Sequence, residues 1–245
     1  MPHYYTLADY YDSFTGNVDY GRRADFLVGI FSKTSVSEAV LDAGCGTGMM
    51  SRLLMDRGYD VIGVDNSPEM LSVAREKNPE QLLLCQDITE LDLYGTIQGA
   101  ICLQDTLNHL DSVSMVERAV ARISLFLEEG FYFVFDINTI YKHRNILADN
   151  AFIFENDKAF CVWRNDYNVA DGSVGIRLDV FSENGDGRYT RKAEAFREIL
   201  IPEEEIEGIL SRNGLEIETV LDGETLDEVR PDTQRLLYVT RKIKK

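Results

Sequence analysis

Apolar runs and amphipathic stretches alternate over roughly the first 140 residues of the chain. Short runs rich in Val, Ile and Leu predict strands, and stretches with apolar residues every three or four positions predict helices. The strands are expected at 38–43, 60–65, 81–85, 97–103 and 130–136, and the helices near 48–57, 67–77 and 111–128. This alternation predicts a parallel sheet with right-handed crossovers.

The first 36 residues are expected to be helical. Leu27, Ile30 and Phe31 fall at helical spacing, so the second part of this region predicts an amphipathic helix that packs on the core. Ser67 and Pro68 begin the helix at 67–77 with a serine cap and a proline in the first turn.

The pattern changes after Asp136 and becomes typical of β structure. Three stretches alternate polar and apolar residues: Ala159–Tyr167, Val174–Ser182 and Tyr189–Ile201. Asp171-Gly172 and Asn184-Gly185-Asp186-Gly187 are hairpin turn signals. We therefore expect a three- or four-stranded antiparallel insert.

A helical pattern returns at Pro202 and stops at Asn213-Gly214, which is a typical C-terminal cap. Two last strands are expected at 215–220 and 235–241. The predicted organisation has three parts: N-terminal helices with the first part of an α/β domain (1–149), an antiparallel β insert (150–200) and the completion of the α/β domain (201–245).

The composition is that of a soluble globular protein with a strong acidic excess. The 42 acidic and 25 basic residues give a formal net charge of -17, and nucleic-acid binding relies on Lys and Arg, so we expect no nucleic-acid partner. No 18-residue apolar stretch predicts a membrane span. The first residues lack the basic and apolar regions of a signal peptide, so we expect a cytoplasmic protein.

The four cysteines are scattered and form no CxxC pair. Of Cys45, Cys85, Cys102 and Cys161, three fall in predicted strands or the glycine loop, where cysteine is usually a small buried residue. We interpret all four as reduced and structural, and we predict no zinc site.

A glycine-rich loop follows the first strand, in the run Val40-Leu41-Asp42-Ala43-Gly44-Cys45-Gly46-Thr47-Gly48. Such glycines let backbone N–H groups and a helix N-terminus approach a ligand closely. Asp65 ends the second strand, where an acidic side chain can accept both ribose hydroxyls of an adenosine. A dinucleotide fingerprint would need glycine where Met49 stands, and no Gly-Lys-Ser/Thr follows for a P-loop.

The motifs resemble those of class I S-adenosylmethionine-dependent methyltransferases. The matching segments are the Asp42–Gly48 loop, the acidic segment Val61–Leu71, the adenine segment Cys85–Ile88 and the segment Ile101–Leu110 after the fourth strand. The likeness covers about residues 1–140 well and the last 45 by topology alone. Similar enzymes are small bacterial methyltransferases of mostly unassigned substrate. The resemblance implies a Rossmann-like, seven-stranded sheet that is mostly parallel with an antiparallel last strand, has helices on both faces and carries the β insert.

The resemblance also implies a site for S-adenosyl-L-methionine, with S-adenosyl-L-homocysteine as product. The implied cofactor-binding residues are Tyr11, Tyr20, Asp42, Gly44, Cys45, Gly46, Gly48, Asp65, Asn66, Met70, Asp87, Ile88 and Gln104. In this reading the glycines and Gln104 lie against the methionine portion, with Asp42 near its ammonium group. Asp65 holds the ribose, and Asp87 accepts the adenine amino group.

Candidate catalytic groups follow the fourth and fifth strands. His109 is the preferred general base because histidine as a residue type suits proton transfer near neutrality, and Asp105 is the second candidate. The alternative for His109 is a histidine bonded to the backbone at a helix start, and Asp105 and Asn108 could equally fix a loop. For His143, flanked by Lys142 and Arg144, we favour a solvated position. Too few acidic residues gather there to predict a metal.

The insert alternates aromatic and charged residues. One interpretation is a sheet with one face on the core and one in water. We favour a lid over the acceptor site, because the insert follows the fifth strand at the ligand-binding edge of the sheet. Trp163, Arg164 and Tyr189 are the candidate acceptor-binding residues.

The leading function is methyl transfer from S-adenosylmethionine to a small-molecule acceptor by in-line displacement. A catalytically silent module that senses the cofactor or binds a partner is the alternative, and an oxidoreductase fits less well because Met49 replaces the dinucleotide glycine. The acceptor and its reacting atom (O, N, S or C) stay open. We expect no membrane partner and a monomer or homodimer.

Overall fold

The computed structural model describes residues 8, 11–14, 18–36, 39–155, 159–184 and 186–243. The first seven residues of the expected N-terminal helical region and the end of the basic tail, 244–245, lie outside the described residues. Among the described residues, α1 (Tyr11–Phe14) and α2 (Tyr20–Phe31) precede the sheet.

Seven strands form one sheet in the order β10-β11-β5-β4-β1-β2-β3. Neighbouring strands from β3 to β5 run parallel, and β11 runs antiparallel to both β5 and β10. The bounds are β1 (Val40–Ala43), β2 (Val61–Asp65), β3 (Leu82–Cys85), β4 (Ile97–Cys102), β5 (Leu127–Asn138), β10 (Leu215–Asp222) and β11 (Arg235–Lys242). The predicted mostly parallel sheet with an antiparallel last strand is confirmed.

Helices cover both faces of this sheet because its strands are apolar on both sides. On one face α2 and α3 (Met49–Met55) pack against alternate strand residues such as Val40 and Val134. On the other face α5 (Val113–Phe126) and α6 (Glu203–Arg212) pack against Leu41 and Phe133. The remaining helix, α4 (Pro68–Lys77), contacts β2 and β3, and Ser67 caps it as predicted.

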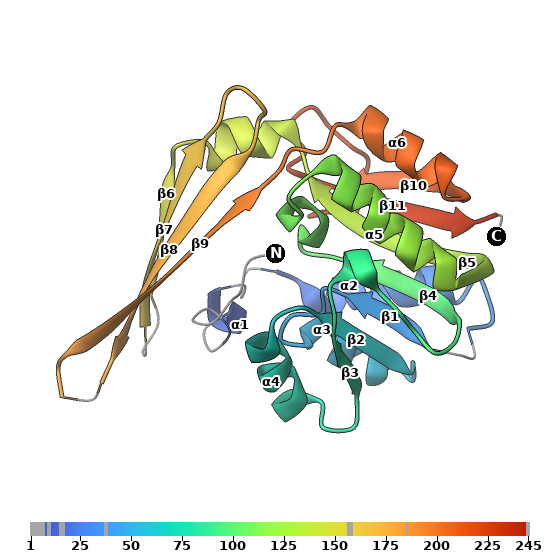
Figure 1. Ribbon diagram of the computed structural model, residues 1–245, viewed down its shortest axis with the longest axis horizontal. Helices are drawn as coiled ribbons and strands as arrows, with labels where there is room; N and C mark the ends of the chain where they lie inside the picture. The colour runs from blue at the N-terminus through green and yellow to red at the C-terminus, as the bar shows by residue number, and fades with distance from the viewer. Residues whose placement is uncertain are drawn as a thin grey trace.

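A second, four-stranded antiparallel sheet extends beside the carboxyl ends of the first (Figure 1). Its strands are β6 (Ala151–Glu155), β7 (Ala159–Tyr167), β8 (Val174–Glu183) and β9 (Tyr189–Glu198), in that spatial order. Every second residue of β8, from Val174 to Val180, is buried in a small separate core. The predicted antiparallel insert is confirmed with four strands, and Gly172 and Gly187 adopt the positive φ angles that its turns need.

Short helical segments connect the large elements. They are η1 (Ile88–Glu90), η2 (Thr106–His109) and the π-helical segment η3 (Lys142–Leu147), which the sequence did not predict. The prediction of a solvated His143 is wrong, because η3 turns this side chain inward, where it is fully buried and its Nδ1 lies 2.7 Å from the Gly172 carbonyl oxygen. The four cysteines are free, and Cys85 is exposed on the edge strand β3, contrary to the expected burial. None of the helices described is long and apolar enough to cross a membrane.

Asn108 ties the insert to the large sheet. Its Nδ2 donates to the Ile199 carbonyl (2.9 Å), the Ile199 N–H donates to the Asn108 carbonyl (2.8 Å), and its Oδ1 accepts the Asn138 N–H (2.9 Å). The side chain is fully buried, so each bond compensates a group that water cannot reach. The loop-fixing interpretation of Asn108 is the one the structure supports.

We expect Asn108→Ala to lower the free energy of unfolding by about 3 kcal/mol, because the Ile199 carbonyl and the Asn138 N–H lose buried partners. Urea unfolding measures the loss. Asn145→Ala is the matched control, because this exposed amide donates to the Tyr141 carbonyl in its own turn and its removal should cost less than about 1 kcal/mol. Equal losses in the two variants would contradict the role of Asn108.

Candidate active site

The site lies where the chain order of the sheet reverses. β1 and β4 are neighbours, and from them the chain leads to opposite edges of the sheet, which opens a crevice beyond their carboxyl ends. A cavity of about 500 Å³ occupies this place. Its lining from the α/β domain is Tyr11, Val18, Gly44, Gly46, Asp65, Met70, Gln104, Asp105, Thr106, His109, Lys142, Glu224, Gln234 and Arg235. Its lining from the insert is Phe154, Cys161, Trp163, Leu178, Phe196 and Glu198.

The glycine loop forms the floor of the cavity. Gly44 has a φ of 77°, and a Cβ there would collide with the Thr106 side chain, so the two loops can approach only because this residue is glycine. Gly46 has a φ of 53° and would place a Cβ within 4 Å of no atom. The loop therefore leaves open space over Gly46, where a ligand can approach the backbone.

Asp65 fixes the glycine loop to the end of β2. Its Oδ2 accepts the Gly46 N–H (2.9 Å) and its Oδ1 accepts the Ser67 N–H (2.9 Å). Burial raises the pKa of this carboxyl, and the two backbone N–H bonds act against the shift. Asp65 lines the cavity, and each of its oxygens has a further lone pair for a ligand hydroxyl.

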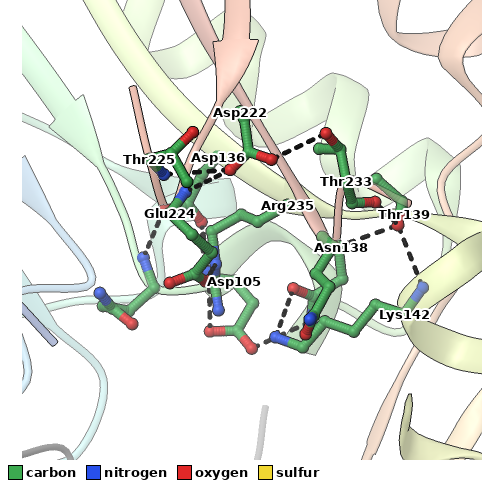
Figure 2. Close-up of polar contacts among 12 residues, drawn as sticks. Asp105, Asp136, Asn138, Thr139, Lys142, Asp222, Glu224, Thr225, Thr233 and Arg235 are labelled. Atoms are coloured by element: carbon green, nitrogen blue, oxygen red, sulfur yellow. Dashed lines mark hydrogen bonds and ion pairs between the residues drawn. The ribbon is translucent and has the colours of Figure 1, made fainter. Parts of the chain in front are cut away.

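A buried ionic network holds the turn after β4 (Figure 2). Asp136, which is fully buried in β5, accepts the backbone N–H groups of Gln104 (3.0 Å) and Asp105 (2.7 Å). Both residues have positive φ angles, 57° and 54°, which non-glycine residues adopt only when their surroundings compensate the strain. Arg235 at the start of β11 donates to the same carboxylate at 2.8 Å.

This network directs two predicted site residues into the cavity. Gln104 lines the cavity, and its buried Nε2 has no hydrogen-bond partner among the described residues. Asp105 accepts from Asn138 Nδ2 (3.0 Å) and from Arg235 (3.3 Å). Burial alone would raise the pKa of Asp105, but the charges of Arg235 and Lys142 outweigh it, and the pKa lies well below its ordinary value. Asp105 is therefore a carboxylate.

His109 and Glu198 lie beside Asp105. One potential ligand atom from each of these three side chains lies within 4.8 Å of the others. The ring of His109 packs edge-on against Phe196 of β9, with the ring centres 5.1 Å apart. The structure thus places the predicted general base at the junction between the α/β domain and the insert.

The insert contributes an aromatic wall. Trp163 lines the cavity and lies against Phe152 and Phe154 of β6, at 5.8 and 6.1 Å between ring centres. Arg164 and Tyr189 do not line the cavity, so their place in the acceptor site stays a prediction. Arg164 follows Trp163 in a strand, so it points to the opposite face and pairs there with Asp179; Tyr189 is 59% exposed at the distal hairpin.

The N-terminal helix α1 lies next to the glycine loop. Tyr11 lines the cavity, and burial, followed by the neighbouring charge of Tyr20, raises its pKa well above the ordinary value. Asp12 accepts from Thr47 Oγ1 at 2.6 Å and pairs with Lys77. These two contacts hold α1 over the glycine loop.

Several predicted cofactor residues lie around the cavity rather than on it. They are Tyr20, Asp42, Cys45, Gly48, Asn66, Asp87 and Ile88. Asp42 is buried behind the loop and accepts from Ser51 Oγ (2.6 Å); Gly48 caps α3 and packs against α4. Asp87 caps η1 by accepting the Thr89 N–H at 2.8 Å. Their assigned cofactor contacts stay predictions.

Sequence reasoning missed four charged residues of the site: Lys142, Glu198, Glu224 and Arg235. None lies near a recognisable motif, and each reaches the cavity from a different late element of the chain. Only the alternation of β9 gave a signal for Glu198, because Phe196 and Glu198 share one face of that strand.

Known proteins share this fold and these motifs. Residues 41–135 match the family described as a methyltransferase domain. A protein of Geobacillus sp. (strain WCH70) that is named as a methyltransferase is 29% identical over 213 residues, 84% of this chain and 85% of that protein. The crystal structure of an S-adenosylmethionine-dependent methyltransferase from Clostridium acetobutylicum covers 96% of both chains at 29% identity, with a TM-score of 0.87.

A third relative matches over a shorter segment. The dTDP-3-amino-3,6-dideoxy-alpha-D-glucopyranose N,N-dimethyltransferase of Streptomyces fradiae is 32% identical over 107 residues, 43% of this chain and 42% of that enzyme.

The sheet order, the glycine loop and these relatives define a nucleoside-dependent group-transfer enzyme of the α/β class. The matched domain, the relatives and the shared fold support the assignment of the chain to the class I S-adenosylmethionine-dependent methyltransferases. The residues present fit this cofactor. Gly46 leaves open space over the loop, and Asp65 offers a carboxylate where the ribose would bind. The Gln104 Nε2, which has no partner among the described residues, can donate to the carboxylate of the methionine portion.

Asp42 predicts a pH dependence of stability. Burial raises its pKa from 3.8 to about 6, so between these values the unfolded chain releases a proton that the folded protein keeps. The contribution of Asp42 to the free energy of unfolding should therefore fall as the pH rises from 4 to 6, by up to about 3 kcal/mol. Urea unfolding of the wild type and of Asp42→Asn at pH 4.5 and 7 measures it: the variant should gain relative to the wild type at the higher pH. A pH-independent difference would contradict the shift.

Asp136→Asn should destabilise the protein by about 3 kcal/mol, because Arg235 loses a buried charge partner and one backbone N–H of the β4 turn loses its acceptor. Urea unfolding measures this effect. Glu224→Gln is the matched control: Glu224 contacts the same guanidinium at 3.3 Å, but its side chain is 47% exposed, so the loss should stay below about 1 kcal/mol. Equal losses would show that the network does not depend on Asp136.

Proposed function

We propose that this methyltransferase acts on a small molecule that binds between the glycine loop and the β insert. The observation that carries the proposal is the continuity of the cavity. Gly44, Gly46 and Asp65 line one part, Trp163 and Phe196 line another, and all belong to the same space of about 500 Å³. A cavity of this size with aromatic walls and a few polar groups suits a small-molecule acceptor beside the methyl donor.

The donor half is formed by residues on short, rigid turns. The glycine loop holds the methionine portion, Gln104 donates to its carboxylate, and Asp65 accepts the ribose hydroxyls. When bound, S-adenosylmethionine supplies an electrophilic methyl group on a positively charged sulfur. Preorganised loops favour the reaction because methyl transfer depends on holding the nucleophile in line with the breaking bond.

His109 is proposed as the general base. Its ring lies at the edge of the acceptor half, within 4.8 Å of a carboxylate oxygen of Asp105. The Asp105 carboxylate stabilises the imidazolium that forms when a ring nitrogen takes a proton from the acceptor. The Asn138 and Arg235 bonds to Asp105 keep this carboxylate in place, so Asp105 acts as a positioning residue for the base.

The insert is proposed as the wall that shields the acceptor from water. Phe154, Trp163 and Leu178 present apolar surface to the cavity, and Asn108 anchors the end of β9 to the turn that carries His109. Exclusion of water strengthens the electrostatic interactions within the cavity.

The relative from S. fradiae supports a small-molecule acceptor, because its name describes methylation of a nucleotide-linked amino sugar. Its match covers less than half of either chain, so its own substrate is not assigned to this protein. The cytoplasmic location, the absence of nucleic-acid and membrane partners, and the monomeric or homodimeric state stay predictions of the sequence.

The proposal is tested with S-adenosylmethionine labelled in the methyl group and a pool of bacterial metabolites smaller than about 1 kDa. The wild type should transfer label to a member of the pool. His109→Gln should lower the rate by 10²- to 10⁴-fold, the usual contribution of a general base. The affinity for S-adenosylhomocysteine, measured by calorimetry, should change less than threefold in this variant, because the proposed role of His109 is to take a proton from the acceptor.

Two results would contradict the proposal. Binding of S-adenosylhomocysteine without any transfer to the pool would favour the alternative of a silent sensor. Transfer of label only to protein or nucleic acid in a whole lysate would exclude a small-molecule acceptor.

A further inference from the structure

Asp105, His109 and Glu198 converge on one point of the cavity wall. Asp105 and His109 belong to the turn after β4, and Glu198 ends β9. Their potential ligand atoms lie within 4.8 Å of one another, so a point between them is at most about 2.8 Å from each. That is the length of a charge-assisted hydrogen bond from an ammonium nitrogen.

The two carboxylates are held in position before any ligand arrives. Asn138 Nδ2 donates to Asp105 Oδ2 (3.0 Å) and to Glu198 Oε2 (2.7 Å), so one amide sets the separation of both groups. His143 lies behind Glu198, with its Nε2 3.6 Å from Glu198 Oε2; this fully buried nitrogen has no hydrogen-bond partner among the described residues. The geometry is therefore imposed by the fold.

The charge balance of the cavity favours a cation. Four carboxylates line the cavity, those of Asp65, Asp105, Glu198 and Glu224. Two cationic side chains line it as well, those of Lys142 and Arg235. Arg235 already pairs with Asp136, outside this set, at 2.8 Å. The sulfonium of the donor compensates one of the remaining negative charges, and an ammonium on the acceptor would compensate another.

The aromatic wall fits the same class of ligand. Trp163 and Phe196 line the cavity together with the three polar groups, and Phe196 contacts the ring of His109. Aromatic faces attract organic cations and cover the carbon skeleton that carries them.

We propose that the acceptor is a primary or secondary amine, and that Asp105, His109 and Glu198 bind its amino group as the ammonium. This inference rests on the function proposed above. A ring nitrogen of His109 takes one proton from the ammonium. The freed nitrogen lone pair forms the new N–C bond to the methyl carbon while the C–S bond breaks and its electron pair stays on sulfur. The products are an N-methylammonium, neutral S-adenosylhomocysteine and a proton that leaves His109 for solvent.

The single tryptophan of the chain makes a direct binding test available, because Trp163 lies in the cavity wall. The probes are benzylamine and benzyl alcohol, which have similar shapes and differ in charge at pH 7. With S-adenosylhomocysteine present, benzylamine should change the Trp163 fluorescence with at least tenfold higher affinity than benzyl alcohol.

Two carboxamide variants test which side chains cause the preference for benzylamine over benzyl alcohol. Glu198→Gln and Asp105→Asn should each reduce the preference for benzylamine to less than threefold. Glu224→Gln, which removes one cavity-lining charge outside the group, should keep most of it. Thermal unfolding of each variant confirms that it is folded at the temperature of the titration.

Equal affinity for the amine and the alcohol in the wild type would overturn the proposal, as would equal effects of Glu198→Gln and Glu224→Gln. Displacement of benzylamine by micromolar Zn²⁺ or Mg²⁺ would instead assign the three side chains to a metal. Calorimetry with S-adenosylhomocysteine distinguishes a failure of the proposed methyltransferase function from a failure of the proposed amine acceptor. If the wild type does not bind S-adenosylhomocysteine, the proposed function itself is overturned. If it binds S-adenosylhomocysteine but does not prefer the amine, only the proposal of an amine acceptor is overturned.

Discussion

The site depends on one buried carboxylate. Asp136 is fully buried in the centre of the sheet, where an uncompensated charge would cost several kcal/mol. Its partners are two backbone N–H groups of the strained turn after β4, the guanidinium of Arg235 from β11 and, at 3.7 Å, the guanidinium of Arg23 from α2. The same interactions that stabilise this charge therefore keep Gln104 and Asp105 in left-handed conformations and fix the antiparallel last strand beside the site. The interactions of Asp136 therefore determine both the packing of β11 and the geometry of the turn after β4.

The insert is coupled to this centre through two asparagines. Asn108 bonds the backbone of Ile199 as the chain leaves β9, and Asn138 at the end of β5 bonds Asp105 and Glu198 together. Each is fully buried, so neither bond competes with water. The acceptor wall and the donor loop are thus held in register by short polar contacts, although they belong to two different sheets (Figure 1).

Local signals in the sequence predicted the fold, and they also carry the assignment of the donor half of the site. Strand and helix periodicity, the glycine loop and Asp65 all act within a few residues, so the sheet and the insert followed from them, and so did the prediction of a cofactor loop at Gly44. Long-range contacts could not be predicted in this way. Arg235 reaches Asp136 from 99 residues away, and the burial of His143 depends on a π-helical turn against the insert. Strand alternation assigns Arg164 and Trp163 to opposite faces, and only the structure shows that the face of Trp163 meets the cavity.

The central claim is that one cavity joins a donor site at the glycine loop to an acceptor site at Asp105, His109 and Glu198. A crystal structure with S-adenosylhomocysteine tests it most directly. The ribose hydroxyls should lie within hydrogen-bond distance of Asp65, the amino acid portion against Gly44 and Gln104, and the sulfur should face the group formed by Asp105 and His109. A sulfur atom directed away from that group, or a ribose without contact to Asp65, would contradict it.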